Sequence, residues 1–250
     1  MSKARKLTDD EFMRDWSDIW RKVLGRDELR FFLALGEPFD KPDWVQTALP
    51  NSFIVLSAPL DQGWPQGYPE KLKIGHDFEP LLKALQERGT SEVIVSCITG
   101  NAIWDKNDAE RGFTQYGAFE PSMDGLDAMR GMDFLDYHSL CFSREADWGL
   151  VGTMDKCSIL AATPEFMERF FHHAGGKDVV RLRFYWYDDC YDWGMADDSD
   201  AQIIETLYGI AGWPLPEYTK WKHGPYDEDK RDIDIERPAW TREFQDKETT

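Results

Sequence analysis

Carboxylate and aromatic side chains are concentrated between residues 184 and 200, in the stretch FYWYDDCYDWGMADDSD. This stretch holds six aspartates and six aromatic residues, and it contains neither lysine nor arginine. Grouped carboxylates can coordinate a divalent cation, act as general acid and base, or form a surface for a positively charged partner. Each of these chemistries requires its own spacing and its own companion residues.

The spacing of the aspartates does not match a calcium-binding loop. An EF-hand loop needs oxygen ligands at positions 1, 3 and 5, glycine at position 6 and glutamate at position 12. A loop that starts at Asp188 has Cys190 at position 3 and Trp193 at position 6. A loop that starts at Asp189 aligns Gly194 correctly, but Trp193 then occupies a ligand position. We therefore expect no metal ligand in this stretch and no cofactor.

The histidines and cysteines add no catalytic arrangement. His172 and His173 are adjacent in a predicted helix and point about 100° apart, so they are poorly placed to share a metal. Cys97 and Cys157 lie in apolar runs and are predicted to be core thiols. The sequence also lacks the GxGxxG, GxxxxGK[ST], GxSxG and HExxH motifs. We therefore expect a protein without catalytic residues.

Hydrophobic periodicity predicts an α+β fold, with helices packed on a mixed or mainly antiparallel sheet in a single domain. Helices are expected at 8–25, where Thr8 and Glu11 match a capping box, and at 76–89, 125–132, 163–174 and 199–212. Strands are expected at 53–58, 91–98, 138–143, 148–151, 157–162 and 179–187. The short linkers between 138 and 162 indicate an antiparallel meander, and the first two strands with their helix resemble a βαβ unit.

The domain prediction places one α+β domain at residues 1–214. Residues 215–250 are polar and contain proline, which predicts an extended segment lying on the domain. A subdivision near 125–137 is the alternative, because that region is rich in glycine and its secondary structure is ambiguous.

The predicted strand at 179–187 would be followed by an exposed acidic and aromatic turn. Asp197, Asp198 and Asp200 flank Ser199, a predicted helix N-cap, where the helix dipole favours carboxylates. The remaining carboxylates have no such explanation, and exposed aromatics beside carboxylates suit a partner that presents Arg or Lys. An ordinary solvated loop is the alternative. The predicted partner contacts are Tyr185, Tyr187, Asp188, Asp189, Tyr191, Asp192 and Trp193.

The formal net charge of −18 restricts the possible partners. Residues 126–250 hold 26 acidic and 14 basic side chains, so the acidic excess is greatest in the second half. A negative field repels nucleic acid and anionic lipid and accelerates capture of a basic protein, although solubility alone would also explain it. The start of the chain has no apolar signal-peptide core, and no apolar run is long enough to span a membrane. We therefore expect a cytoplasmic protein with a basic protein partner.

Residues 138–171 read HSLCFSREADWGLVGTMDKCSILAATPEFMERFF. Their short strands, DWGLV element, small-residue strand and TPEFMERFF helix start resemble bacterial immunity proteins encoded beside polymorphic toxins. This resemblance implies a cytoplasmic protein that neutralises a cognate toxin by occluding it, and it assigns no functional residues. The alternative is a hydrolase that combines Asp188, Asp189 or Asp192 with His138 or a divalent metal.

Overall fold

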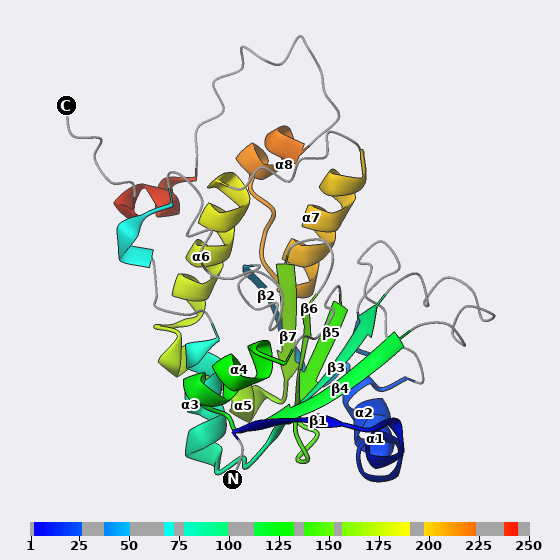
Figure 1. The fold of residues 1–250 in the computed structure, drawn as a ribbon. Helices are drawn as coiled ribbons and strands as arrows, with labels where there is room; N and C mark the ends of the chain where they lie inside the picture. The colour runs from blue at the N-terminus through cyan, green and yellow to red at the C-terminus, as the bar shows by residue number, and fades with distance from the viewer. Residues whose placement is uncertain are drawn as a thin grey trace.

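A seven-stranded antiparallel sheet forms the centre of the protein (Figure 1). The computed structural model describes residues 3–26, 38–50, 68–72, 78–99, 113–132, 138–152, 157–190, 198–223 and 238–244. Within these residues the strand order is β1-β4-β3-β5-β6-β7-β2, and each neighbouring pair is antiparallel. The strands are β1 Ala4–Leu7, β2 Val45–Pro50, β3 Val93–Thr99, β4 Phe113–Phe119, β5 His138–Phe142, β6 Trp148–Gly152 and β7 Cys157–Ala162.

The structure confirms the α+β class and the predicted meander of β5, β6 and β7. It also adds three strands that the sequence did not predict, β1, β2 and β4. Strand β2 was missed because it lies in a proline-bearing passage that reads as loop. Pro50 is accommodated because it ends β2, which is an edge strand with its pairing on one side only. The strand predicted at 53–58 lies outside the described residues. The strand predicted at 91–98 is β3, and both of its neighbours are antiparallel.

Eight α-helices and two 3₁₀ helices are described in these parts of the chain (Figure 1). The α-helices are α1 Asp9–Asp15, α2 Ser17–Leu24, α3 Glu79–Arg88, α4 Met123–Arg130, α5 Pro164–His173, α6 Lys177–Cys190, α7 Asp198–Ile210 and α8 Glu217–His223. The 3₁₀ helices are η4 Glu70–Leu72 and η6 Ala239–Phe244. Among the described residues, no helix has the length and apolar character needed to cross a membrane.

Local sequence signals account for several helix ends. The capping box of Thr8 and Glu11 starts α1, and Gly25 ends α2 in the left-handed conformation with φ of 73°. The predicted single helix at 8–25 is broken at Trp16, which separates α1 from α2. Thr163 occupies the N-cap position of α5 as predicted, but its side chain makes no capping hydrogen bond. The last predicted helix begins at Asp198, so Ser199 lies inside α7 and does not cap it.

Helices cover both faces of the sheet, as adjacent residues of β6 demonstrate. Successive side chains of a strand point to opposite faces. Trp148 stacks on Phe166 of α5, with ring centroids 5.9 Å apart. The next residue, Gly149, faces α2, and a Cβ atom there would lie 2.7 Å from Cγ1 of Val23. Glycine is therefore required where α2 packs against β6.

Two further predictions about the second half of the chain are wrong. Residues 179–187 belong to helix α6 and not to a strand. The segment after 215 was expected to be extended, but it contains α8 and η6. Helices α6 and α7 pack beside β2, which protects this edge of the sheet from pairing with another chain.

Candidate functional site

The predicted contact residues at 185–188 lie in the C-terminal half of α6, where they are buried. Tyr185, Tyr187 and Asp188 have exposed fractions of 0%, 5% and 1%. The expected exposure of these three residues is therefore wrong, because a packed helix has replaced the expected strand and turn. Asp189 is half-buried. Tyr191, Asp192 and Trp193 lie outside the described residues, so their role as partner contacts stays a prediction.

The strand prediction failed because α6 is buried on several sides. A surface helix alternates apolar and polar faces with a period of 3.6 residues, whereas a helix buried all round has no polar face. Because Tyr185 and Tyr187 have polar hydroxyls, they counted as polar positions, and polar and apolar residues then alternated as in a strand. Both tyrosine rings are in fact buried. The apolar residues that alternate with them are also buried: Val180, Leu182, Phe184 and Trp186.

Asp188 belongs to a buried polar cluster at the junction of α6, α7 and α8. Tyr208 of α7 lies close enough to feel the charge of Asp188, and Thr219 of α8 is also buried there. Burial raises the pKa of the Tyr208 hydroxyl well above its ordinary value, and the neighbouring Asp188 raises it further. Tyr208 therefore keeps its proton inside the cluster at neutral pH.

Lys222 of α8 binds the C-terminal end of α6. Its Nζ atom donates to the carbonyl oxygen of Asp188 and, at 2.9 Å, to that of Asp189. The last carbonyls of a helix lack partners within the helix and carry partial negative charge, so a cation is favoured there. The last turn of α6 contains no basic residue. Lys222 therefore supplies from another helix the charge that this turn lacks.

Two arginines of α6 bind other segments. Arg183 donates to the carbonyl oxygen of Leu72 at 3.1 Å and to that of Ala174 at 2.9 Å. The guanidinium of Arg181 lies over the indole of Trp240 in η6. Together with the contacts of Asp188 and Lys222, these interactions make α6 the helix on which segments far apart in sequence are joined, and this explains the density of polar and aromatic residues on it.

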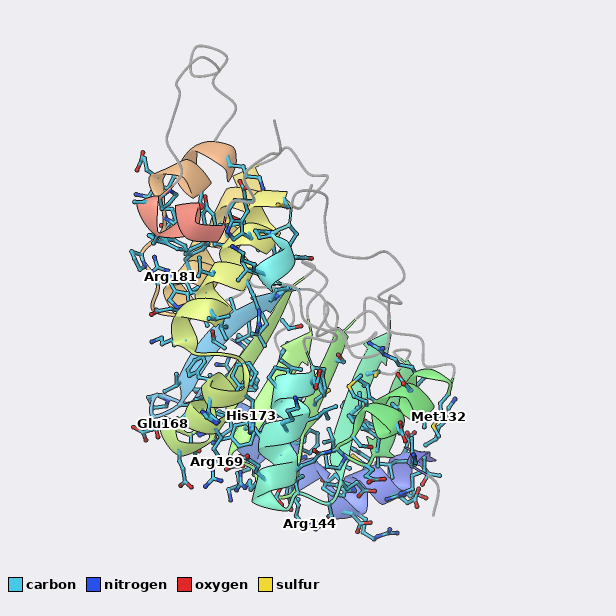
Figure 2. All side chains as sticks on the ribbon, turned by 90° about the vertical axis from the view of Figure 1, so that its left-hand side faces the viewer. Met132, Arg144, Glu168, Arg169, His173 and Arg181 are labelled. Atoms are coloured by element: carbon cyan, nitrogen blue, oxygen red, sulfur yellow. The ribbon has the colours of Figure 1, made fainter. Side chains whose placement is uncertain are left out.

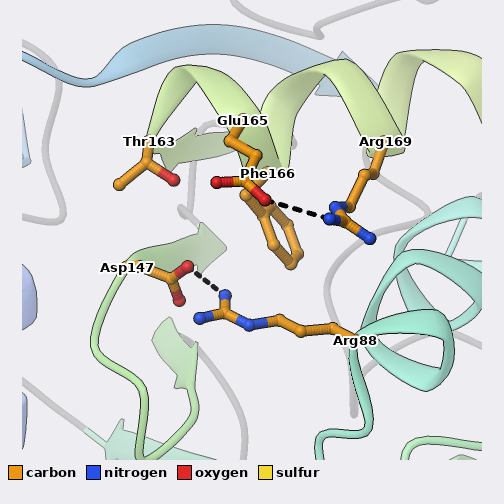
Figure 3. Close-up of a pocket in the computed structure, with 6 residues that line it drawn as sticks. All are labelled: Arg88, Asp147, Thr163, Glu165, Phe166 and Arg169. Atoms are coloured by element: carbon orange, nitrogen blue, oxygen red, sulfur yellow. Dashed lines mark hydrogen bonds and ion pairs between the residues drawn. The ribbon is translucent and has the colours of Figure 1, made fainter.

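A separate group of charged side chains surrounds a small surface hollow of about 70 Å³ between α3, α5 and the β5–β6 turn (Figure 3). Arg88 at the end of α3 pairs with Asp147 of the turn. Arg169 of α5 pairs with Glu165, one turn earlier, at 2.9 Å. Thr163 and Phe166 complete the lining. The backbone N–H of Thr163 donates to the carbonyl oxygen of Asp147 at 2.9 Å, which fixes the turn beside the start of α5.

The hollow and the α6 region lie on the same side of the molecule but at different levels. Figure 2 shows Arg169 and His173 of α5 in its lower part and Arg181 of α6 higher up. Sequence reasoning missed the hollow because its charged residues come from three segments that are joined only by the fold. Each arginine already has a carboxylate partner, so the hollow presents paired charges of both signs to solvent.

The histidines and cysteines of the described residues agree with a structural role. Cys97 and Cys157 are buried thiols, as predicted, Cys141 is buried as well, and Cys190 is half-buried. His173 Nε2 lies 3.0 Å from a carboxylate oxygen of Glu87. Within the described parts of the chain, no group of three or more His, Cys, Asp or Glu residues has the arrangement of a metal site.

Comparisons with protein-family models, with characterised proteins and with solved structures found no match to this chain.

Proposed function

We propose that this protein is a cytoplasmic inhibitory binding protein of the immunity type, which neutralises a basic toxin domain by covering it. In this proposal the protein performs no chemistry of its own. It holds its partner through complementary charge and aromatic contacts, and the complex blocks access to the toxin's working surface.

The observation that carries the proposal is the display of acidic side chains at the surface. The chain has a net charge of −18, yet Asp188 is the one buried acidic residue among those whose burial the structure describes. The other acidic side chains of that set reach solvent at least in part. A surface field of this sign attracts a basic protein over a distance of about 10 Å at moderate salt.

The contact residues within this proposal differ from those predicted from the sequence. Tyr185, Tyr187 and Asp188 support α6 from inside, so they act on a partner only through the shape of that helix. Asp189 is half-buried at the end of α6, and Asp192 follows it in the sequence. We propose Asp189, together with Asp192, as acidic contacts for the partner.

The test co-expresses the full chain with the basic domain encoded by the reading frame next to its gene. We expect the chain to restore growth and to copurify with that domain. The association rate should fall at least tenfold as salt is raised from low to about 0.5 M, because screening removes electrostatic steering. A neighbouring domain that arrests growth equally with and without this chain would contradict the proposal.

Charge reversal tests the contact residues separately. Asp189→Lys combined with Asp192→Lys should slow association about tenfold at low salt. Asp18→Lys on α2 is the control, because the Asp18 side chain is 95% exposed. This substitution changes the net charge by the same amount per substituted residue as the Asp189 and Asp192 reversals do. One outcome is that the Asp189/Asp192 variant restores growth and associates at the same rate as the control. That result would support the immunity function and contradict the assignment of these two residues as contacts.

A further inference from the structure

The indole of Trp240 occupies a well-defined site on α6. The guanidinium carbon of Arg181 lies 4.2 Å from the centroid of the indole. The ring of Tyr185 meets the same indole edge-on, with centroids 5.0 Å apart and an interplanar angle of 67°. A cation over the face of a tryptophan and an edge-to-face aromatic pair are both favourable arrangements. The two α6 residues therefore form a site with the chemistry to select an electron-rich aromatic ring.

The segment that carries Trp240 is small and internally folded. In η6, the backbone N–H and the hydroxyl of Thr241 both donate to the carbonyl oxygen of Pro238, at 2.9 and 2.7 Å. These two hydrogen bonds fix the backbone of the segment beside Trp240. A six-residue 3₁₀ helix is not stable on its own in water, so docking of Trp240 contributes to its order. Figure 1 shows η6 beside α6, at the outer side of the molecule.

We propose that Arg181 and Tyr185 form an indole-binding site for a short peptide, that Trp240 occupies this site in cis, and that residues 238–244 dock and release as a unit. The cation–π contact and the aromatic pair together favour the docked state by roughly tenfold to a few hundredfold, and the full burial of Thr241 adds to this. This is small beside the ratio of folded to unfolded molecules, about 10³ to 10⁸. Release of the segment therefore precedes unfolding, and it opens the site to a tryptophan-bearing peptide from elsewhere.

The test uses the full chain and a fluorescent peptide with the sequence of residues 236–244, ERPAWTREF. The peptide should bind the Trp240→Ala variant, whose site is empty, and should bind the unchanged protein at least tenfold more weakly. A peptide with alanine in place of the tryptophan should bind neither protein. Adding Arg181→Met to Trp240→Ala should weaken binding about tenfold, because the cation over the indole is lost.

Equal affinity of the peptide for the unchanged protein and for Trp240→Ala would overturn the proposal. Absence of binding to Trp240→Ala up to about 1 mM peptide would also overturn it. Hydrogen exchange in the unchanged protein gives a second test that does not depend on the variant. The amide of Thr241 should exchange by local opening, faster than the amide of Met167, which donates to Thr163 in α5 at 3.0 Å. Exchange of both amides only by global unfolding would contradict docking and release.

Discussion

The α6 region and the hollow between α3 and α5 use similar side chains for different ends. Around α6, buried aromatic rings and the buried Asp188 lie beside half-buried cations, and together these groups connect segments from η4 to η6. At the hollow, two arginines and two carboxylates pair at the surface, within reach of water. A dense run of polar residues in a sequence therefore does not by itself identify a functional surface, because burial decides what these residues do.

The same difference determines the energetic cost of changing each region. Removing one partner from a buried hydrogen bond leaves the other group with no hydrogen-bond partner in the protein and no water to replace it. This costs about 1–3 kcal/mol. An exposed ion pair contributes only about 0–1 kcal/mol, because water and salt replace the lost partner. We therefore expect substitutions around α6 to reduce the free energy of unfolding more than substitutions at the hollow do.

The largest effect is expected for Phe184→Ala in α6. Phe184 is fully buried, and its ring contacts Tyr208 and Trp213 at centroid distances of 5.7 Å. Truncation leaves a cavity and should reduce the free energy of unfolding by about 3–5 kcal/mol in urea denaturation. Met13→Ala, at a side chain that is 55% exposed, is the control and should change it by less than about 0.5 kcal/mol. Equal costs for both variants would show that α6 is not part of the folded core.

A smaller effect is expected for Lys222→Met, which keeps the length of the side chain and removes the charge. Two carbonyl oxygens at the end of α6 lose their donor, so the free energy of unfolding should fall by about 1–3 kcal/mol. Lys220→Met is the matched control on the same helix, because Lys220 lies 3.7 Å from Glu217 in an exposed pair. A cost no greater than that of the control would remove Lys222 as the cap of α6.

The buried Tyr208 predicts a specific loss of stability at alkaline pH. Its pKa is raised in the folded state, so above about pH 10 the unfolded chain releases this proton while the folded chain retains it. The unfolded state then gains stability as pH rises. Unfolding measured from pH 8 to 11 should show a steeper decline for the unchanged protein than for Tyr208→Phe. Parallel curves would mean that Tyr208 does not resist ionisation.

The smallest effects are expected at the hollow, and they should differ between its two ion pairs. Arg88→Met breaks a partly buried pair and should cost about 1 kcal/mol, whereas Arg169→Met breaks an exposed pair within one helix and should cost about 0.3–0.5 kcal/mol. Double-mutant cycles with Asp147→Asn and Glu165→Gln measure each coupling. A cost of about 3 kcal/mol at Arg88, the upper end of the range expected for a lost buried hydrogen bond, would contradict the distinction between the two regions.

Sequence patterns predicted the parts of the fold that depend on local signals. The meander of β5 to β7 follows from short apolar runs with hairpin-length linkers, and the start of α1 follows from the capping box of Thr8 and Glu11. Gly89, with φ of 80°, ends α3 as expected for a residue that adopts the left-handed conformation without strain. These features need no knowledge of distant residues.

Features that depend on distant contacts could not be predicted. Helix α6 appeared to be a strand because contacts on several of its sides, including those from η6 and α8, remove its polar face. The hollow joins Arg88 to Asp147, residues that are 59 positions apart and have no common motif. The sequence therefore marked residues 184–200 only as a region of unusual composition, and the burial of residues 185–188 was missed.

The position of α6 has a consequence for the order of folding. Arg183 bonds to Leu72 across 111 positions, and Lys222 reaches back 34 positions to Asp188. Such contacts form only after long stretches of chain have been closed into loops, so they carry a high entropic cost and come late. The β5–β7 meander can form first from neighbouring residues. Substitutions in α6 should then mainly accelerate unfolding, with little change in the folding rate, which makes this helix one determinant of how long the native state persists.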